Sequence, residues 1–511
     1  MQHLRITLLT IFLFGCGGGG SGEKLIVPQV SIDWEAGIYP ESSLLKSACE
    51  NPRSGDEFDD RSGSTMHEKM WLRSYSDETY LWYDEIPDQD PSPYSVLGYF
   101  DQLVTTGLTP SGQNKDRFHF TYDTAAWEAL SQSGVSSGYG MQLAIDGRSV
   151  RILYTEPDSP ATSPSANLSR GAHILAVDGI DIASASSTAQ INAINAGLFP
   201  SAAGLSHSFT VRDAGATVER ELTLVSEAVV SSPVQHVKVF DVAGTATGYM
   251  LFNDHIATAE SALADAISFF AAQSVEELVI DLRYNGGGYL DIASALAFMV
   301  AGEEQTSGKT FELLQFNDKH PTFNPITGQR LEPQGFESAA SGDFSLPSGV
   351  AFPSVNLSRL FVLTGPNTCS ASESVINSLR GIDVELIQIG STTCGKPYGF
   401  YATDNCGTTY FTIQFRGVNA KGFGDYSDGF SPSSSVSLVE TEIPGCEVAD
   451  DLENELGNAL EGRLAAALHY IEHGSCPDAS MPKPSLLKSG AEIDVEPVML
   501  NLPPWRQNRL M

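Results

Sequence analysis

The sequence predicts a multidomain α/β protein with a helical N-terminal region, a small β-rich module, and an α/β core that layers helices on a sheet. Its 511 residues exceed one ordinary hydrophobic core, at about 150 residues per domain. Short segments of alternating apolar and polar residues fill positions 134–228, as expected for β-strands. Between 234 and 446, apolar segments of strand length alternate with helical ones, which is typical of layered α/β domains.

The first residues have the pattern of an export signal. One positive charge, Arg5, precedes an apolar run over 6–14, which is too short for a membrane span but suits a signal peptide. The run leads to Cys16 in a context that resembles the cleavage site of bacterial lipoproteins, where the cysteine becomes lipidated. We expect a signal at 1–15 and a flexible tether at 16–55. The alternative is an ordinary secretory signal with an incidental cysteine.

The charge and the cysteine content of the chain limit its expected partners and cofactors. The net charge is −34, which repels phosphate backbones, so we expect no nucleic-acid partner. Apart from Cys16 the cysteines form an even set: Cys49, Cys369, Cys394, Cys406, Cys446 and Cys476. In an oxidising compartment they are expected to form disulfides, in one of several connectivities, with free buried thiols as the alternative. Their spacing fits no zinc site, and we expect no metal and no other cofactor.

Local patterns divide the remaining chain. Positions 56–133 are mostly helical, with helices expected at 65–83 and 95–105. The β-rich module at 134–228 has expected strands at 140–143, 150–153 and 173–177. The core at 234–446 has expected strands at 277–282, 360–364 and 385–389, and helices at 289–300 and 370–379. A closing helix within 447–476 carries leucines at i+4 spacing, namely Leu452, Leu456, Leu460, Leu464 and Leu468. The tail at 477–511 has no expected core.

Ser370 lies where a strand, a short loop and a helix follow one another. A serine at a helix N-terminus has free backbone N–H groups and the helix dipole beside it, and both stabilise a developing oxyanion. The structural alternative is an ordinary helix cap, because Glu373 follows three residues later as in a capping box. The pattern by itself favours neither interpretation.

Lys396 is the candidate base for this serine. It follows the next strand along the chain, in a glycine-containing turn. Consecutive strands of such a sheet often lie side by side, which brings their carboxyl ends together. A lysine accepts a proton only when burial lowers its pKa by several units. Without the serine motif, a surface lysine in a turn is the better interpretation.

Together these segments resemble peptidase family S41, the C-terminal-processing serine peptidases. The matching motifs are Asp281-Leu282-Arg283-x-Asn285-x-Gly287-Gly288, Ser370-Ala371-Ser372-Glu373 and Gly395-Lys396. The resemblance extends over roughly 66–446, with flanking matches at 80–83, 115–118, 248–250, 419–422 and 428–432.

The resemblance implies a serine endopeptidase. Ser370 is the implied nucleophile and Lys396 its general base, with the N–H groups of Gly287 and Ala371 as the oxyanion hole. Many relatives have a glutamine four residues after the lysine, where this chain has Phe400. We therefore expect a dyad without a third member.

The segment 134–228 resembles a PDZ domain. Gly138, Tyr139, Gly140 and Met141 lie where such domains bind a terminal carboxylate with backbone N–H groups, while the last residues of the ligand add as a strand. The implied partners are proteins or peptides with accessible C-termini. The alternative is a packing module that binds no peptide.

Other functions remain open on the sequence. Gly134-x-Ser136-x-Gly138 fits the nucleophile-elbow formula of α/β-hydrolases, but it precedes a strand instead of joining a strand to a helix. The ten histidines leave a Ser-His-Asp triad formally possible. A protein of a different class, an inactive PDZ scaffold that binds chain ends on the envelope, is the main alternative to a peptidase.

Two further expectations follow from the implied roles. Cys369 precedes the nucleophile and Cys394 lies two residues before the base, so a catalytic approach of about 3 Å brings their Cα atoms toward disulfide distance; pairing with Cys406 is the alternative. The implied location is the periplasmic side of the cell envelope, held by the lipid on Cys16. We favour the outer membrane because Gly17 is not the aspartate that commonly retains lipoproteins at the inner membrane.

Overall fold

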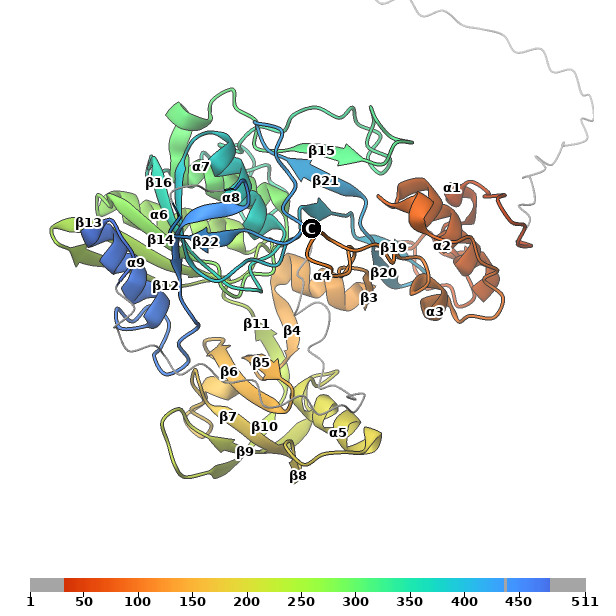
Figure 1. The fold of residues 1–511 in the computed structure, drawn as a ribbon. Coiled ribbons are helices and arrows are strands. Elements are labelled where there is room, and N and C mark those ends of the chain that lie inside the picture. Colours follow the sequence, from red (N-terminus) through yellow and green to blue (C-terminus); the bar gives the residue numbers. More distant parts are fainter. Residues whose placement is uncertain (1–31, 436–438, 478–511) are drawn as a thin grey trace, which may run out of the picture.

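The computed structural model describes residues 32–435 and 439–477. It has a mixed α/β fold with several sheets, which confirms the α/β character expected from the sequence. The core, the N-terminal helices and the β-rich module occupy three sides of the molecule (Figure 1). Residues 1–15, Cys16 and nearly all of the tail at 477–511 lie outside the described residues. No helix in the described ranges is long and apolar enough to span a bilayer.

The core is built on a large sheet with the strand order β12-β13-β14-β16-β17-β23-β22. β12 runs antiparallel to β13, and the other neighbours pair in parallel. The strands are β12 (Val234–Val242), β13 (Thr245–Phe252), β14 (Glu277–Asp281), β16 (Arg359–Thr364), β17 (Glu385–Gly390), β22 (Ser431–Ser433) and β23 (Glu442–Glu447). The helices are α6 (Ala259–Ala272), α7 (Leu290–Thr306), α8 (Ala371–Gly381) and α9 (Gly462–His473).

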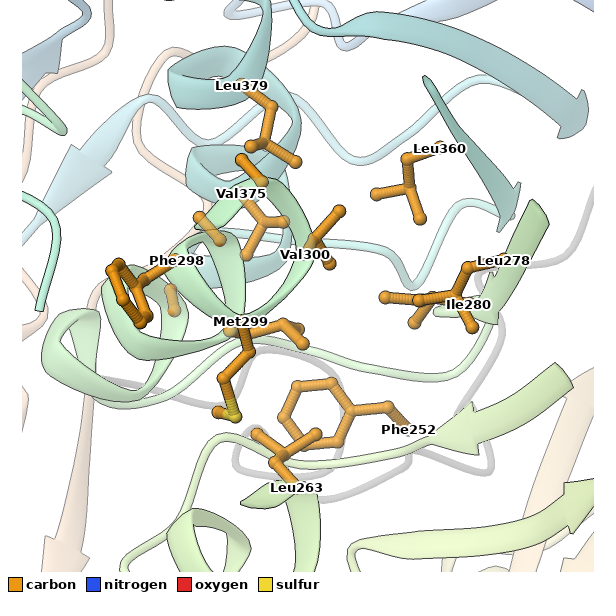
Figure 2. Close-up of a cluster of buried hydrophobic side chains, with 14 of the residues drawn as sticks. Phe252, Leu263, Leu278, Ile280, Phe298, Met299, Val300, Leu360, Val375 and Leu379 are labelled. Atoms are coloured by element: carbon orange, nitrogen blue, oxygen red, sulfur yellow. The ribbon is translucent and has the colours of Figure 1, made fainter. Parts of the chain in front are cut away.

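Helices cover both faces of this sheet because alternate residues of each strand point to opposite sides. Leu278 and Ile280 pack into the large core cluster with residues of α6, α7 and α8 (Figure 2). Val279, between them, belongs to the cluster formed with α9. This double burial explains why β14 consists of consecutive apolar residues.

The N-terminal region is joined to the core by a shared sheet. Its elements are α1 (Ser42–Leu45), β1 (Ala48–Cys49), β2 (Arg61–Ser62), α2 (Thr65–Thr79), the 3₁₀ turn η1 (Tyr83–Glu85), α3 (Val96–Phe100), β3 (Phe120–Asp123) and α4 (Thr124–Ser133). β3 pairs with β20 (Thr408–Phe411), which pairs with β19 (Thr403–Asn405). A second small sheet contains β15 (Leu313–Phe316), β21 (Phe415–Val418) and β18 (Tyr398–Gly399). Segments far apart in sequence therefore meet on this side of the core.

The β-rich module has its own apolar core. Its main sheet has the order β10-β9-β7-β6-β5, with β8 paired to β7. The elements are β4 (Val135–Gly138), β5 (Met141–Asp146), β6 (Ser149–Thr155), the 3₁₀ turn η2 (Pro160–Thr162), β7 (His173–Val177), β8 (Ile180–Asp181), α5 (Thr188–Leu198), β9 (Ser206–Arg212), β10 (Arg220–Val225) and β11 (Glu227–Val230). A separate ladder of β4 with β11 connects the module to the rest of the chain.

The expected tether at 16–55 is wrong at its C-terminal end. Leu45 and Cys49 are buried, and a disulfide joins Cys49 to Cys406. The prediction failed here because Cys406, the disulfide partner of Cys49, lies 357 residues away in the sequence.

Three expected helices are shorter in the structure. The helix expected at 65–83 is α2, which covers Thr65–Thr79. The helix expected at 95–105 is α3, which covers only Val96–Phe100. The leucine-bearing helix is α9, which starts only at Gly462 because Glu461 accepts the Leu464 N–H as its N-cap. Leu452 and Leu456 instead belong to the apolar cluster between the module and the core.

Candidate active site

Ser370 is the N-cap of α8 and follows the loop after β16. Its backbone has φ 55° and ψ −117°, a conformation that residues with side chains rarely adopt and that concentrates at functional sites. The loop is tied to the neighbouring strand end. Thr368 Oγ1 donates to Leu282 O at 2.8 Å, and the Cys369 N–H donates to Asn285 O at 3.1 Å. Ser370 is buried at the N-terminal end of the helix dipole.

Lys396 follows β17, the parallel neighbour of β16. Its side chain is buried, and Nζ makes no hydrogen bond to any described residue. The Phe400 ring centroid lies 4.2 Å from Nζ and the Phe118 centroid lies 5.0 Å away. Burial lowers the pKa of Lys396 to about 7, although the carboxylates of Asp116 and Glu373 oppose the shift. The lysine is therefore poised to exchange a proton near neutral pH.

The Glu373 carboxylate connects the serine segment to the lysine segment. Its Oε2 accepts the N–H of Ser370 at 3.1 Å and the N–H of Lys396 at 2.8 Å. Its Oε1 accepts the N–H of Gly395 at 2.9 Å and the hydroxyl of Thr393. Burial raises the pKa of Glu373, and these donors oppose that effect. Because one oxygen bonds both amides, the nitrogen atoms of Ser370 and Lys396 lie no farther apart than the sum of 3.1 Å and 2.8 Å.

A disulfide adds a covalent link between the same segments. Cys369 and Cys394 are bonded, with their Cα atoms 5.2 Å apart. Arg117, from the N-terminal region, donates to Cys394 O at 2.7 Å. The remaining cysteines of the described ranges pair as Cys49–Cys406 and Cys446–Cys476. The bond limits how far the segment before the lysine moves from the segment before the serine.

The glycine loop after β14 packs against the start of α8. Gly287 has φ +101°, and a Cβ there would lie 2.7 Å from Ser370 Cβ and 3.0 Å from Ala371 N, so a side chain has no room. The structure thus brings together Ser370, Gly287 and Ala371. In this structure the Gly287 N–H donates to Asn285 Oδ1 at 2.9 Å, so the expected oxyanion role requires this hydrogen bond to be exchanged for one to the substrate. Short Asn side chains often fold back on an amide two residues later, and this contact occupies the expected donor.

Buried ion pairs connect the glycine loop to neighbouring segments. Arg283 binds Glu461 at 2.6 Å and Asp450 at 2.8 Å. Arg170, from the β-rich module, binds Asp450 at 2.7 Å and donates to the Tyr284 hydroxyl at 2.6 Å. Burial opposes ionisation of Asp450, but the two guanidinium groups hold its pKa well below the usual range. The module, the glycine loop and the cap of α9 therefore share one charge network.

Tyr398, two residues after Lys396, lines a cavity of about 440 Å³. Trp82 and Lys115 of the N-terminal region form part of its wall, and Phe316 and Arg416 of the small sheet form another part. Cavities of this size hold small ligands or peptide side chains. The wall combines aromatic surface with cationic groups.

The module residues predicted to bind peptide lie together at one sheet edge. Gly138 ends β4 and Met141 begins β5. Gly140 between them has φ +75°, and the buried Tyr139 ring contacts Phe209 at 5.4 Å between centroids. β5 is the last strand in the sheet order.

Some sequence expectations find no support at the site, and other residues were missed. Ser136 pairs with Val229 inside β4, so it does not occupy a strand-to-helix turn. Cys16 lies outside the described residues. Asp116, whose charge acts on Lys396, and His255, which bonds to the glycine loop, were not among the predicted site residues. The only sequence signal for His255 is its place just after a strand of the core.

Parts of this chain are similar to known proteins. Residues 246–399 match the model of peptidase family S41. A carboxyl-terminal-processing protease of Picosynechococcus sp. is 27% identical over 183 residues, which is 34% of this chain and 41% of the relative. Another from Synechocystis sp. is 26% identical over 168 residues, covering 33% and 38% respectively. The chain therefore spans about two fifths of the length of these relatives.

The fold is also similar to that of a solved structure. A candidate S41 protease from Bacteroides fragilis aligns with a TM-score of 0.57 and 24% identity, over 83% of this chain and all of that one. The fold is therefore that of a mixed α/β protein similar to S41 protease structures. Residues 246–399 are therefore similar to peptidase family S41, and two relatives of this chain are carboxyl-terminal-processing proteases.

Proposed function

We propose that the protein is a serine endopeptidase in which Ser370 and Lys396 act as a dyad. Neutral Lys396 takes the proton of the Ser370 hydroxyl while the oxygen forms a bond to the scissile carbonyl carbon. The carbonyl π electrons become the oxyanion, which backbone N–H groups at Gly287 and Ala371 stabilise. Collapse of this intermediate breaks the C–N bond, and protonated Lys396 gives its proton to the leaving amine. Water then hydrolyses the acyl-enzyme with Lys396 again as base.

The observation that carries this proposal is the buried lysine beside the serine segment. A surface lysine is protonated at neutral pH and cannot accept a proton. Burial among Phe118 and Phe400 removes the water that stabilises an ammonium group and lowers the pKa of Lys396 to about 7. Its Nζ has no hydrogen-bond partner among the described residues. We therefore expect the contact with Ser370 to form when substrate binds, as catalytic hydrogen bonds often tighten only then.

Degradation of casein by purified variants tests the dyad. Ser370→Ala and Lys396→Ala should abolish cleavage, and Lys396→Arg should also fail because guanidinium stays protonated. Lys421→Ala is the matched control, since that lysine is exposed and pairs with Asp383 at the surface. Near-normal turnover by Lys396→Ala would refute the assigned mechanism.

We also propose that substrates are recognised by their C-termini at the β-rich module. The outer position of β5 in its sheet supports this, because an extended peptide pairs with a free strand edge. The glycine-containing turn from Gly138 to Met141 provides backbone N–H groups at one end of that edge. A peptide with a free C-terminus should be cleaved faster than the same peptide with a C-terminal amide. Equal rates would contradict this mode of recognition.

For the cellular location we propose a lipid anchor on Cys16 at the periplasmic side of the envelope, in the outer membrane. The apolar run before Cys16 supports this. Cys16→Ser should release the protein into the soluble periplasmic fraction or leave its signal uncut. An unmodified mature N-terminus at another residue, seen by intact mass, would contradict it.

A further inference from the structure

His255 lies behind the glycine loop that the proposed mechanism uses. It follows β13 and is fully buried. Its backbone N–H donates to Gly287 O at 3.1 Å, and its carbonyl accepts the Tyr289 N–H at 2.8 Å. Its ring Nδ1 lies 3.0 Å from Asn285 Oδ1. Both the main chain and the side chain of His255 are therefore bonded to this loop.

The partners of Asn285 fix the tautomer of His255. The Gly287 N–H can only donate, so the Asn285 atom that faces it must be the oxygen, Oδ1. The other amide atom, Nδ2, donates to Phe252 O at 3.0 Å, which can only accept. Nδ1 of His255 therefore carries a hydrogen and donates to Oδ1. Burial lowers the pKa of His255 to about 4, so the ring is neutral at pH 7.

This arrangement saturates the Asn285 oxygen. A carbonyl oxygen has two lone pairs, and here one accepts the Gly287 N–H and the other the His255 Nδ1–H. The backbone oxygen of Asn285 accepts from Cys369 N and from Ser372 Oγ, each at 3.1 Å. Asn285 therefore links His255, the Gly287 amide and the start of α8.

The Gly287 N–H has two competing acceptors during catalysis. In this structure it bonds Asn285 Oδ1, whereas the proposed oxyanion hole requires it to bond the substrate oxygen. If it turned to the substrate with no other donor nearby, a buried amide oxygen would lose its only partner, which is unfavourable. The His255 Nδ1–H is the second donor that keeps this oxygen paired.

We infer that His255 is a positioning residue for the oxyanion loop, whose Nδ1–H holds Asn285 Oδ1 so that the Gly287 N–H can transfer to the substrate oxygen. The inference rests on the proposed peptidase function. His255 does not touch the reacting atoms in this role. It acts through Asn285 on the orientation of one amide.

A pair of substitutions tests the role. His255→Leu removes the donor, and kcat for a peptide substrate should fall about 10- to 100-fold with KM little changed, the effect of one uncompensated buried acceptor. His255→Asn keeps an amide N–H near the position of Nδ1 and should retain most of kcat. A peptide aldehyde, whose adduct with Ser370 carries the oxyanion, should bind His255→Leu more weakly by the same factor. Wild-type kcat in His255→Leu, or an equal loss in both variants, would overturn the inference.

The tautomer supplies a readout that does not depend on activity. In wild-type protein labelled with [¹⁵N]histidine, the resonance missing from His255→Leu should show a neutral ring protonated at Nδ1 at pH 7. A ring protonated at Nε2, or at both nitrogens, would overturn the inference even in an active enzyme. Absence of Ser370-dependent cleavage in the wild type would instead refute the proposed function, and with it the positioning role of His255.

Discussion

Replacing Lys396 by methionine should stabilise the protein at neutral pH while abolishing its activity. Burial holds the pKa of Lys396 near 7 instead of its ordinary 10.5. At about 1.4 kcal/mol per pH unit, this difference corresponds to a cost of up to about 5 kcal/mol for keeping the ammonium form folded. Methionine has a similar length and no charge, and it suits the aromatic surroundings of Phe118 and Phe400.

The pH dependence of the lysine charge sets how the stability difference between Lys396→Met and wild type changes with pH. Below pH 7 the folded and unfolded proteins both carry the Lys396 proton, and the folded protein bears the full cost of burying the charge. Between pH 7 and 10.5 only the unfolded protein retains the proton, so wild-type stability rises with pH. Lys396→Met lacks this rise. Its advantage should therefore be several kcal/mol at pH 6 and should close toward pH 10.

Urea unfolding followed by tryptophan fluorescence at pH 6, 7, 8, 9 and 10 measures the difference. Lys69→Met is the control, because Lys69 is also buried but donates to Pro91 O at 2.8 Å and to Tyr94 O at 2.9 Å. Removing it takes one hydrogen-bond donor from each carbonyl, although Pro91 O keeps the Tyr94 N–H, and should lower the unfolding midpoint. The reasoning is refuted if Lys396→Met is less stable than wild type at pH 6, or if its advantage does not shrink as pH rises.

Three further results are expected. In wild type, kcat/KM should rise with pH through about 7, since only the neutral lysine accepts a proton; a flat profile would argue against this base. Glu373→Gln should lower turnover, and it should lower the free energy of unfolding by about 2 kcal/mol or more, because its NH₂ group faces backbone N–H donors; unchanged stability would contradict this. Replacing Cys369 and Cys394 together by serine should lower kcat by at least about 10-fold under conditions where the protein is still folded. Replacing Cys446 and Cys476 by serine removes a disulfide that closes a loop of similar length, and it should leave kcat unchanged.

The sequence by itself determined the parts of the core that local chemistry specifies. Runs of apolar residues marked the strands β14, β16 and β17, because both faces of a parallel sheet are buried. Ser370 and Lys396 each follow one of two consecutive strands, and parallel pairing places the ends of such strands at one edge of the sheet. The order of these elements was therefore enough to name the two residues as candidates.

Only the tertiary structure decided how those candidates are set up for chemistry. The burial of Lys396 depends on Phe118, which comes from the N-terminal region nearly 280 residues earlier in the chain. Glu373 fits an ordinary helix cap on the sequence, yet it also binds backbone groups more than 20 residues away. Three contacts between separate segments determine that Nδ1 is the nitrogen of the His255 ring that carries the hydrogen. Periodicity and propensity describe neighbours along the chain, whereas pKa values and hydrogen-bond saturation depend on which distant groups exclude water and supply partners.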